Sequence, residues 1–369
     1  MCNSLHLLEF ERSVQFFVGA KNMLARDCLL KRESSNRCRR ILLRCAALAL
    51  LAFSASSSLA ESCLTANDLD NATRTALTGA ADRYFDLVAK GDTASLRQRA
   101  TPSVASDFSV IETTVRDNQA ALAGSKAAVR PPFLLVAEGA ESIARAEFYC
   151  GVFGSKGQTH DSAVFSLNDL SPGKYAVVIL DAPSSKAAYT VSLILRQEGS
   201  DWKLGGLYIQ VAELAGHNTD WFAARARDFR AKGQMHNAWL YYIEAISLVS
   251  PLPFMSTKGS DDLYDESQKL QPADFPGEGK TSDLVSGTAT YKLTAVLPVI
   301  VGDDLGLLVK YQAADISSTN EAYRNNVAVM KALVAKYAEL RTAFSAVVGR
   351  AVDPSGRDYG TMLAMKEIK

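Results

Sequence analysis

The spacing of apolar residues changes along the first half of the chain, and this change constrains the fold more than any other feature. Between Leu69 and Val88 apolar residues recur every three or four positions, which is the spacing of one helix face. After the loop at Pro131-Pro132, six segments between Phe133 and Val211 alternate as strands do, and turn-forming residues separate them. This order predicts an α+β fold in which N-terminal helices cover one face of an antiparallel curved sheet.

The last two predicted strands resemble part of a known superfamily. The hairpin consists of an apolar strand from Val191, an acidic turn with glycine, and the step Trp202-Lys203-Leu204. It resembles the closing hairpin of the nuclear-transport-factor-two-like superfamily, the cystatin-like cone. The resemblance to this superfamily would cover about residues 64–215. The resemblance implies a cone of sheet and helices with an apolar pocket, which some members use for catalysis and many use only for binding or assembly. The fold alone does not decide between these functions. We assign residues 61–216 to a cone-like α+β domain.

Aromatic residues on the predicted strands are candidates for the lining of this cone. They are Tyr149, Tyr175, Tyr189, Trp202 and Tyr208, of which the last four are the pocket candidates. We expect them on the concave face of the sheet, either as core residues or as the wall of a pocket for an apolar or aromatic ligand.

A helix-turn-helix hairpin is predicted at residues 217–251. Its small and aromatic residues stand at offsets that resemble one tetratricopeptide repeat, and they are Ala226, Phe229, Gly233, Ala238, Tyr242 and Ala245. Alanine facing alanine lets two antiparallel helices approach closely, and the aromatic residues fill the space beside them. About three such repeats are normally needed to bury a stacked core, so we expect this single hairpin to pack on another surface, most simply the preceding sheet domain.

The rest of the chain is predicted as a linker and a small C-terminal α+β domain. Residues 252–287 are rich in Pro, Gly, Ser and Asp, with one short helical candidate at Asp261–Leu270. Residues 288–369 contain two strands, a long helix and a final strand, at Thr290–Val301, Leu307–Ala313, Asn320–Val352 and Tyr359–Ile368. A helix of that length would extend about 50 Å, so we expect it to be broken, to bind a partner, or to pack one face on its own sheet.

The N-terminal 60 residues have the order of a secretory signal. A basic stretch at residues 31–40 precedes an apolar run at Cys45–Phe53, and Ser58-Leu59-Ala60 places small residues where a signal peptidase cleaves. The apolar run has about half the length that a membrane-spanning helix needs. We expect cleavage after Ala60, a periplasmic or secreted protein with no transmembrane span, and translation from Met1 or Met23.

Cysteine usage agrees with export. Four of the six cysteines lie in the leader, which leaves Cys63 and Cys150. Two cysteines in an oxidising compartment predict one disulfide, which would stabilise the fold by about 4–5 kcal/mol on the chain-entropy model. The alternative is a lipoprotein acylated at Cys63, although Ala60-Glu61-Ser62 lacks the usual leucine before such a cysteine.

The charge balance and the motifs exclude several classes of function. The chain has 40 basic and 40 acidic side chains, and the leader holds nine of the former and four of the latter, so the rest is mildly acidic. This balance argues against nucleic acid as a partner. The stretch from Gly277 to Thr281 imitates the end of a phosphate-binding loop, but Asp274 stands where the motif needs glycine. No Gly-x-Ser-x-Gly motif occurs.

No cofactor or metal site is predicted. His160, His217 and His236 are not paired at a four-residue spacing, and no cysteine pair has the spacing of a zinc site. Glu147 and Asp181 lie among apolar neighbours on predicted strands, where burial could raise their pKa values enough for acid–base chemistry, or they could face solvent.

Together these features predict an exported cell-envelope protein that acts as a non-enzymatic binding or assembly module. It would use either the cone pocket or the helical surface, for a small apolar ligand or an envelope protein partner. One alternative is an enzyme with a pocket carboxylate, an isomerase or hydrolase of a small apolar substrate. The other is a lipid-anchored envelope scaffold.

Overall fold

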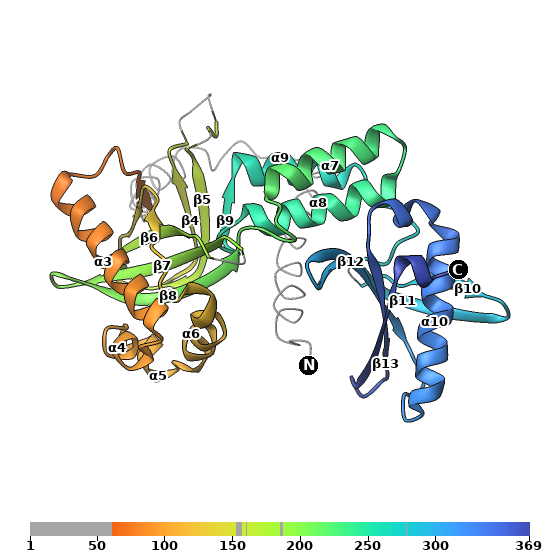
Figure 1. Ribbon diagram of the computed structural model, residues 1–369. Coiled ribbons are helices and arrows are strands. Elements are labelled where there is room, and N and C mark those ends of the chain that lie inside the picture. Colours follow the sequence, from red (N-terminus) through yellow and green to blue (C-terminus); the bar gives the residue numbers. More distant parts are fainter. Residues whose placement is uncertain (1–60, 153–156, 160, 185–186, 278) are drawn as a thin grey trace, which may run out of the picture. The chain divides into compact units, whose positions relative to one another are not determined.

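Helices and mainly antiparallel sheets make up the chain, which confirms the α+β class (Figure 1). The computed structural model describes residues 61–369 apart from 153–156, 160, 185, 186 and 278. The predicted leader, with its cleavage point after Ala60, lies outside the described residues. Among the helices that are described, none is long and apolar enough to cross a membrane.

In the described part of the chain, four helices lie between the first strand of the main sheet and its remaining strands. They are α3 (Asn71–Lys90), α4 (Thr93–Gln98), α5 (Pro102–Ser106) and α6 (Ser109–Leu122). The first of them begins where the Asp70 side chain accepts a hydrogen bond from the Thr73 amide, and it ends at Gly91, whose φ of 70° suits glycine. Leu77, Tyr84 and other apolar side chains of α3 are buried against the sheet.

The sheet beneath these helices has the order β1-β3-β6-β7-β8, with β2 also paired to β6. Its strands are β1 (Ser62–Leu64), β2 (Ala128–Val129), β3 (Phe133–Ala137), β6 (Gly173–Ala182), β7 (Tyr189–Glu198) and β8 (Asp201–Val211). A smaller antiparallel sheet covers the other face, and it consists of β4 (Ile143–Cys150), β5 (Ala163–Leu170) and β9 (Met255–Thr257). Because both faces of the main sheet are covered, Tyr175–Leu180 is buried without a break.

Cys63 in β1 and Cys150 in β4 are bonded through their sulfur atoms, as the sequence predicts. Their Cα atoms lie 5.0 Å apart, and 87 residues separate them along the chain. The bond therefore connects an edge strand of the main sheet to the smaller sheet.

The helical hairpin forms where it is expected, as α7 (Thr219–Ala231) and α8 (Met235–Val249). Gly233 makes the turn with a φ of 73°. The hairpin shares its buried cluster with the C-terminal sheet, which corrects the expectation that it packs mainly on the preceding domain. Hydrogen bonds support this contact, because the Tyr241 hydroxyl donates to the Ala343 carbonyl and the Asn237 amide donates to the Glu339 carbonyl.

The segment at 252–287 is not an open linker. It contains β9, which pairs with β5, then α9 (Lys258–Gln268), which packs on α8, and then β10 (Ser282–Ser286). This polar segment nevertheless places four apolar side chains in the common core, and these are Leu263, Leu270, Phe275 and Leu284. Burial of these few residues determines the path of a segment that composition alone describes as flexible.

The C-terminal sheet has the order β10-β11-β12-β13-β14, and only its β12–β13 pair is parallel among the described strands. Its further elements are β11 (Ala289–Val301), β12 (Asp304–Gln312), α10 (Thr319–Lys336), η2 (Ala338–Thr342), β13 (Ala346–Val352), β14 (Asp358–Ala364) and η3 (Met365–Glu367). The helix α10 makes the crossover that a parallel pair requires. It also packs on this sheet.

The predicted helix at Asn320–Val352 is wrong beyond Lys336. Apolar residues continue at helical spacing through Phe344, Val347 and Ala351, but the segment from Ala346 to Val352 pairs with β12 as a strand. Valines at 347, 348 and 352 favour a strand, and the backbone pairing outweighs the helical pattern. The 50 Å helix does not form, and α10 packs one face on its own sheet, as one of the alternatives predicted.

Candidate functional site

The four aromatic pocket candidates lie on opposite faces of the main sheet. Tyr189 and Trp202 pack with the core cluster on the helix-covered face, whereas Tyr175 and Tyr208 belong to the cluster between the two sheets. Within β8, a β-bulge at Gly205 turns Trp202 and Tyr208 to opposite faces. Ile194 pairs with Gly206 while Leu195 pairs with Leu204, so Gly205 has no partner on β7. Simple alternation would have placed Trp202 and Tyr208 on one face.

The helix-covered face is filled by its own side chains. Leu77, Val115 and Leu193 are fully buried there. Tyr84 donates its hydroxyl to the carbonyl oxygens of Arg99 and Trp202, both at 2.9 Å. Burial raises the pKa of this hydroxyl. The side chains Tyr189 and Trp202 therefore have the core role that was one of the two expectations for them.

The opposite face carries a recess of about 300 Å³ that Tyr175 and Tyr208 line. Phe254, from the segment after α8, closes one side and lies edge-on to Tyr208 with ring centroids 5.5 Å apart. Leu167 and Ile194 add aliphatic wall. The recess is built by residues from the start of α5, from β5, β6, β7 and β8, and from the α8–β9 connection, so no single sequence motif could have indicated it.

Two charged side chains give the recess its polarity. Arg196 lies over the Tyr175 ring, 5.6 Å from its centroid, and donates one hydrogen bond to the Pro172 carbonyl at 3.2 Å. A guanidinium group has five N–H donors, so most of them remain for a ligand. Asp169 also lines the recess, from a left-handed backbone conformation with a φ of 52°.

The two tyrosine hydroxyls of the recess differ in their partners. Tyr175 donates its hydroxyl to the Ser171 carbonyl at 2.7 Å. No residue in the described part of the chain hydrogen-bonds the Tyr208 hydroxyl, and burial raises its pKa. This hydroxyl is therefore free to donate a hydrogen bond to a bound molecule.

The carboxylates that the sequence suggested for acid–base chemistry lie outside this recess. Asp181 accepts three hydrogen bonds from the Arg130 guanidinium, and about half of its side chain is exposed. Glu147 pairs with Arg145 at 2.9 Å and accepts a hydrogen bond from Tyr149 at 2.7 Å. Both are therefore engaged in surface ion pairs.

The phosphate-loop-like stretch and His217 also lie apart from the recess. Gly277 and Lys280 exchange backbone hydrogen bonds in a turn. His217 stacks on Trp221 with ring centroids 3.6 Å apart, and His160 lies outside the described residues.

His236 is a site that sequence reasoning missed. Its Nδ1 lies 2.9 Å from a carboxylate oxygen of Glu339, and its Nε2 lies 3.0 Å from one of Asp274. The rings of Phe275 and Tyr337 flank it, with centroid distances of 4.6 and 4.4 Å. The three polar residues are far apart in sequence, so no spacing pattern could have found them.

This cluster fastens three elements together. His236 lies in α8, and its two ring nitrogens contact one carboxylate before β10 and another in η2. Burial tends to raise the pKa of Asp274, but hydrogen bonds from His236 and Tyr337 outweigh burial, and the pKa lies below its usual value. The arrangement is a polar clamp between the hairpin and the C-terminal domain.

Glu244 on α8 is buried without a cationic partner among the described side chains, with an exposed fraction of 6%. Burial raises its pKa to about 7, and the neighbouring Ser247 hydroxyl offsets only part of this effect. The sequence does carry a signal here, because Glu244 is a single charge within the apolar run from Leu240 to Ile246. This carboxyl does not line the recess.

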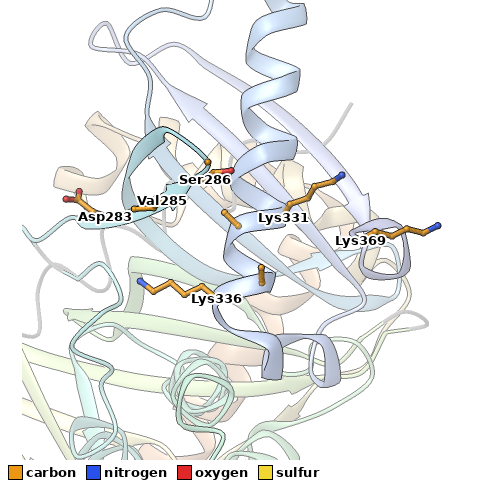
Figure 2. Close-up of a pocket in the computed structure, with 9 residues that line it drawn as sticks. Asp283, Val285, Ser286, Lys331, Lys336 and Lys369 are labelled. Carbon is orange, nitrogen blue, oxygen red and sulfur yellow. The ribbon is translucent and has the colours of Figure 1, made fainter.

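A second depression lies between β10 and α10 in the C-terminal domain, with a volume of about 530 Å³ (Figure 2). Val285, Lys331, Lys336 and Lys369 line it together with Asp283. It is a shallow groove along the sheet edge.

No group of three or more His, Cys, Asp or Glu side chains in the described ranges has an arrangement that could hold a metal ion. Comparison of the chain with protein-family models, with curated proteins and with solved structures finds no match in any of the three. The resemblances to the nuclear-transport-factor-two-like superfamily and to a tetratricopeptide repeat therefore stay predictions.

Proposed function

We propose that this chain is an exported, non-enzymatic binding protein and that the recess lined by Tyr175 and Tyr208 is its ligand site. The observation that carries the proposal is the pairing of an apolar, aromatic wall with the Arg196 guanidinium and the free Tyr208 hydroxyl. The hydroxyl side chains of Thr101, Ser103 and Ser171 also line the recess, so apolar contact surface and hydrogen-bonding groups meet there, as both do in ligand sites.

The chemistry of the recess favours a small apolar molecule with a carboxylate group. Arg196 can bind a carboxylate through two parallel hydrogen bonds, and the Tyr208 hydroxyl can donate a third. The rings of Tyr208 and Phe254 and the aliphatic side chain of Ile194 would contact the apolar part. A volume of about 300 Å³ limits the ligand to a small molecule.

A non-enzymatic role is favoured because the described lining has few reactive groups. It contains neither histidine nor cysteine, and Asp169 is its one carboxylate. The alternative enzyme, an isomerase or hydrolase, would have to use Asp169 as its acid or base. If the protein converts a bound probe into product and Asp169→Asn abolishes this conversion, the enzyme alternative replaces the binding proposal.

Calorimetric titration with phenylacetate tests the proposed ligand class. We expect phenylacetate to bind and phenethylamine, which reverses the charge, not to bind over the same concentration range. Arg196→Gln should weaken phenylacetate binding by about 10- to 100-fold, because a hydrogen bond to a charged group contributes about 1.5–3 kcal/mol.

Arg116→Gln is the matched control, since Arg116 is an exposed arginine on α6 away from the recess. It should bind phenylacetate as the wild type does. Absence of phenylacetate binding, or equal binding by the wild type and Arg196→Gln, would contradict the proposal.

Export is proposed from the leader sequence and from the Cys63–Cys150 bond, because such bonds persist in oxidising compartments. The lipid-anchored alternative competes directly with this bond, since acylation of Cys63 consumes the thiol that Cys150 needs. Intact mass of the protein recovered from the cell envelope distinguishes them. A chain that starts near Glu61, with a mass two hydrogen atoms below that of the reduced form, supports export with a disulfide. An added lipid mass supports the anchor.

A further inference from the structure

We propose that the edge strand β10, with the groove beside it, binds an extended acidic segment of a partner protein by strand addition. The inference is independent of the recess between the two sheets. It rests on the edge position of β10, on the shape of the groove, and on the charges that flank it.

The strand β10 ends the C-terminal sheet on one side. Its five residues pair with β11, and no described strand pairs with its other side. Alternate N–H and C=O groups along such an edge point outward and can pair with another backbone. Val285 on this strand is 65% exposed, so an apolar side chain is available at the same edge.

The groove beside β10 has room for a second chain. Ala332 and Ala335 of α10 line a space of about 530 Å³, and their side chains are small. Figure 2 shows β10 and α10 as its two walls. A partner strand could therefore hydrogen-bond to β10 while its side chains contact the helix.

The charges around the groove favour an acidic partner. Three lysines line it, against the single carboxylate side chain of Asp283. In Figure 2, Lys336 extends to the side on which Asp283 lies, whereas Lys331 and Lys369 extend to the opposite side. Cations that diverge in this way suit charges distributed along an extended chain better than a single anion.

The same lysines argue against a second copy of this chain as the occupant. Two β10 edges placed together would bring Lys331 and Lys336 of one α10 helix near those of the other, and like charges placed close together are destabilising. Nucleic acid or another polyanion could neutralise the lysines but could not satisfy the outward N–H and C=O groups of β10. An acidic polypeptide strand satisfies both.

Fluorescence anisotropy with a labelled heptapeptide that alternates Glu and Val tests the charge requirement. We expect the purified protein to bind this peptide and not its Lys and Val counterpart. The double variant Lys331→Glu, Lys336→Glu should weaken binding at least tenfold. The control double variant Lys232→Glu, Lys366→Glu makes the same charge change at two exposed lysines outside the groove and should alter binding less than twofold.

Two N-methylated forms of the peptide test the backbone requirement. One form carries methyl groups on the Val amides and the other on the Glu amides, and these amides point to opposite edges of the peptide strand. Only one of these edges can face β10, so one form should lose binding and the other should keep it. Equal binding by both forms, or no binding by the unmodified peptide, overturns the proposal. Analytical ultracentrifugation supplies a further test. A wild-type dimer that becomes a monomer in the Lys331→Glu, Lys336→Glu variant also overturns the proposal, because the occupant would then be a second copy.

Discussion

Replacing Glu244 by glutamine should stabilise the protein at alkaline pH and change little at acidic pH. Burial raises the pKa of this carboxyl from its ordinary value of 4.5 to about 7, so the folded chain favours the protonated form. The stability that Glu244 contributes is therefore complete below the unfolded pKa and is lost as the pH rises through about 7. Since one pKa unit corresponds to 1.36 kcal/mol, the ionised carboxyl costs the folded state about 3 kcal/mol at pH 8.

Urea unfolding of the wild type and Glu244→Gln at pH 5 and pH 8 measures this cost. With a denaturant slope of about 3 kcal/mol per M, we expect the midpoint of the variant to exceed that of the wild type by roughly 1 M at pH 8. At pH 5 the difference should fall below about 1 kcal/mol, because the carboxyl is then mostly protonated in the folded chain.

Glu138→Gln supplies the control, since Glu138 is exposed and should show no such pH-dependent gain. A Glu244→Gln variant that is less stable than the wild type at pH 8 would refute the reasoning. An equal difference between the two proteins at both pH values would refute it too, because the carboxyl would then not change its protonation state between pH 5 and pH 8.

Three further predictions follow from the contacts of the fold. His236→Gln should lower the free energy of unfolding by about 1–2 kcal/mol, because it removes the ring that contacts two partly exposed carboxylates. An unchanged urea midpoint would contradict the clamp. Replacing Cys63 and Cys150 together by serine should lower the free energy of unfolding by at most about 4–5 kcal/mol, relative to the wild type without reductant. An unchanged free energy of unfolding would show that the bond does not constrain the unfolded chain. Phe275→Ala should lower the free energy of unfolding by about 3–5 kcal/mol, measured by thermal or urea unfolding, because Phe275 is buried. A loss of less than about 0.5 kcal/mol, as expected for a residue in an open linker, would show that 252–287 does not belong to the core.

Local spacing was sufficient for the elements whose own residues determine their structure. The helical stripe from Leu69 to Val88 and the hairpin turn at Gly233 predicted α3 and the α7–α8 pair. The disulfide followed from counting, because removal of the predicted leader leaves one cysteine pair.

Predictions failed where a distant strand or a small backbone irregularity decides the outcome. Pairing with β12 converts the segment from Ala346 to Val352 into a strand despite its helical spacing. One extra residue, Gly205, turns Trp202 and Tyr208 to opposite faces of the same sheet. Neither effect is present in a window of sequence around the residues concerned.

The proposed sites were the least predictable part. Tyr175 and Tyr208 were recognised as candidates, but Arg196 and Phe254 join them only through strand pairing and the path of the segment after α8. The clamp at His236 depends on carboxylates 38 and 103 residues further along the chain. Such groupings require the tertiary structure.

Methyl NMR of the protein during addition of phenylacetate tests the binding proposal most directly. Neighbouring positions in β7 provide an internal control, because Ile194 lines the recess while Leu193 and Leu195 face the helix-covered core. We expect shifts that grow with phenylacetate concentration at Ile194 and Leu167, with Leu193 and Leu195 unchanged. Shifts confined to Leu193 and Leu195, or no shift at any of the four, would contradict it.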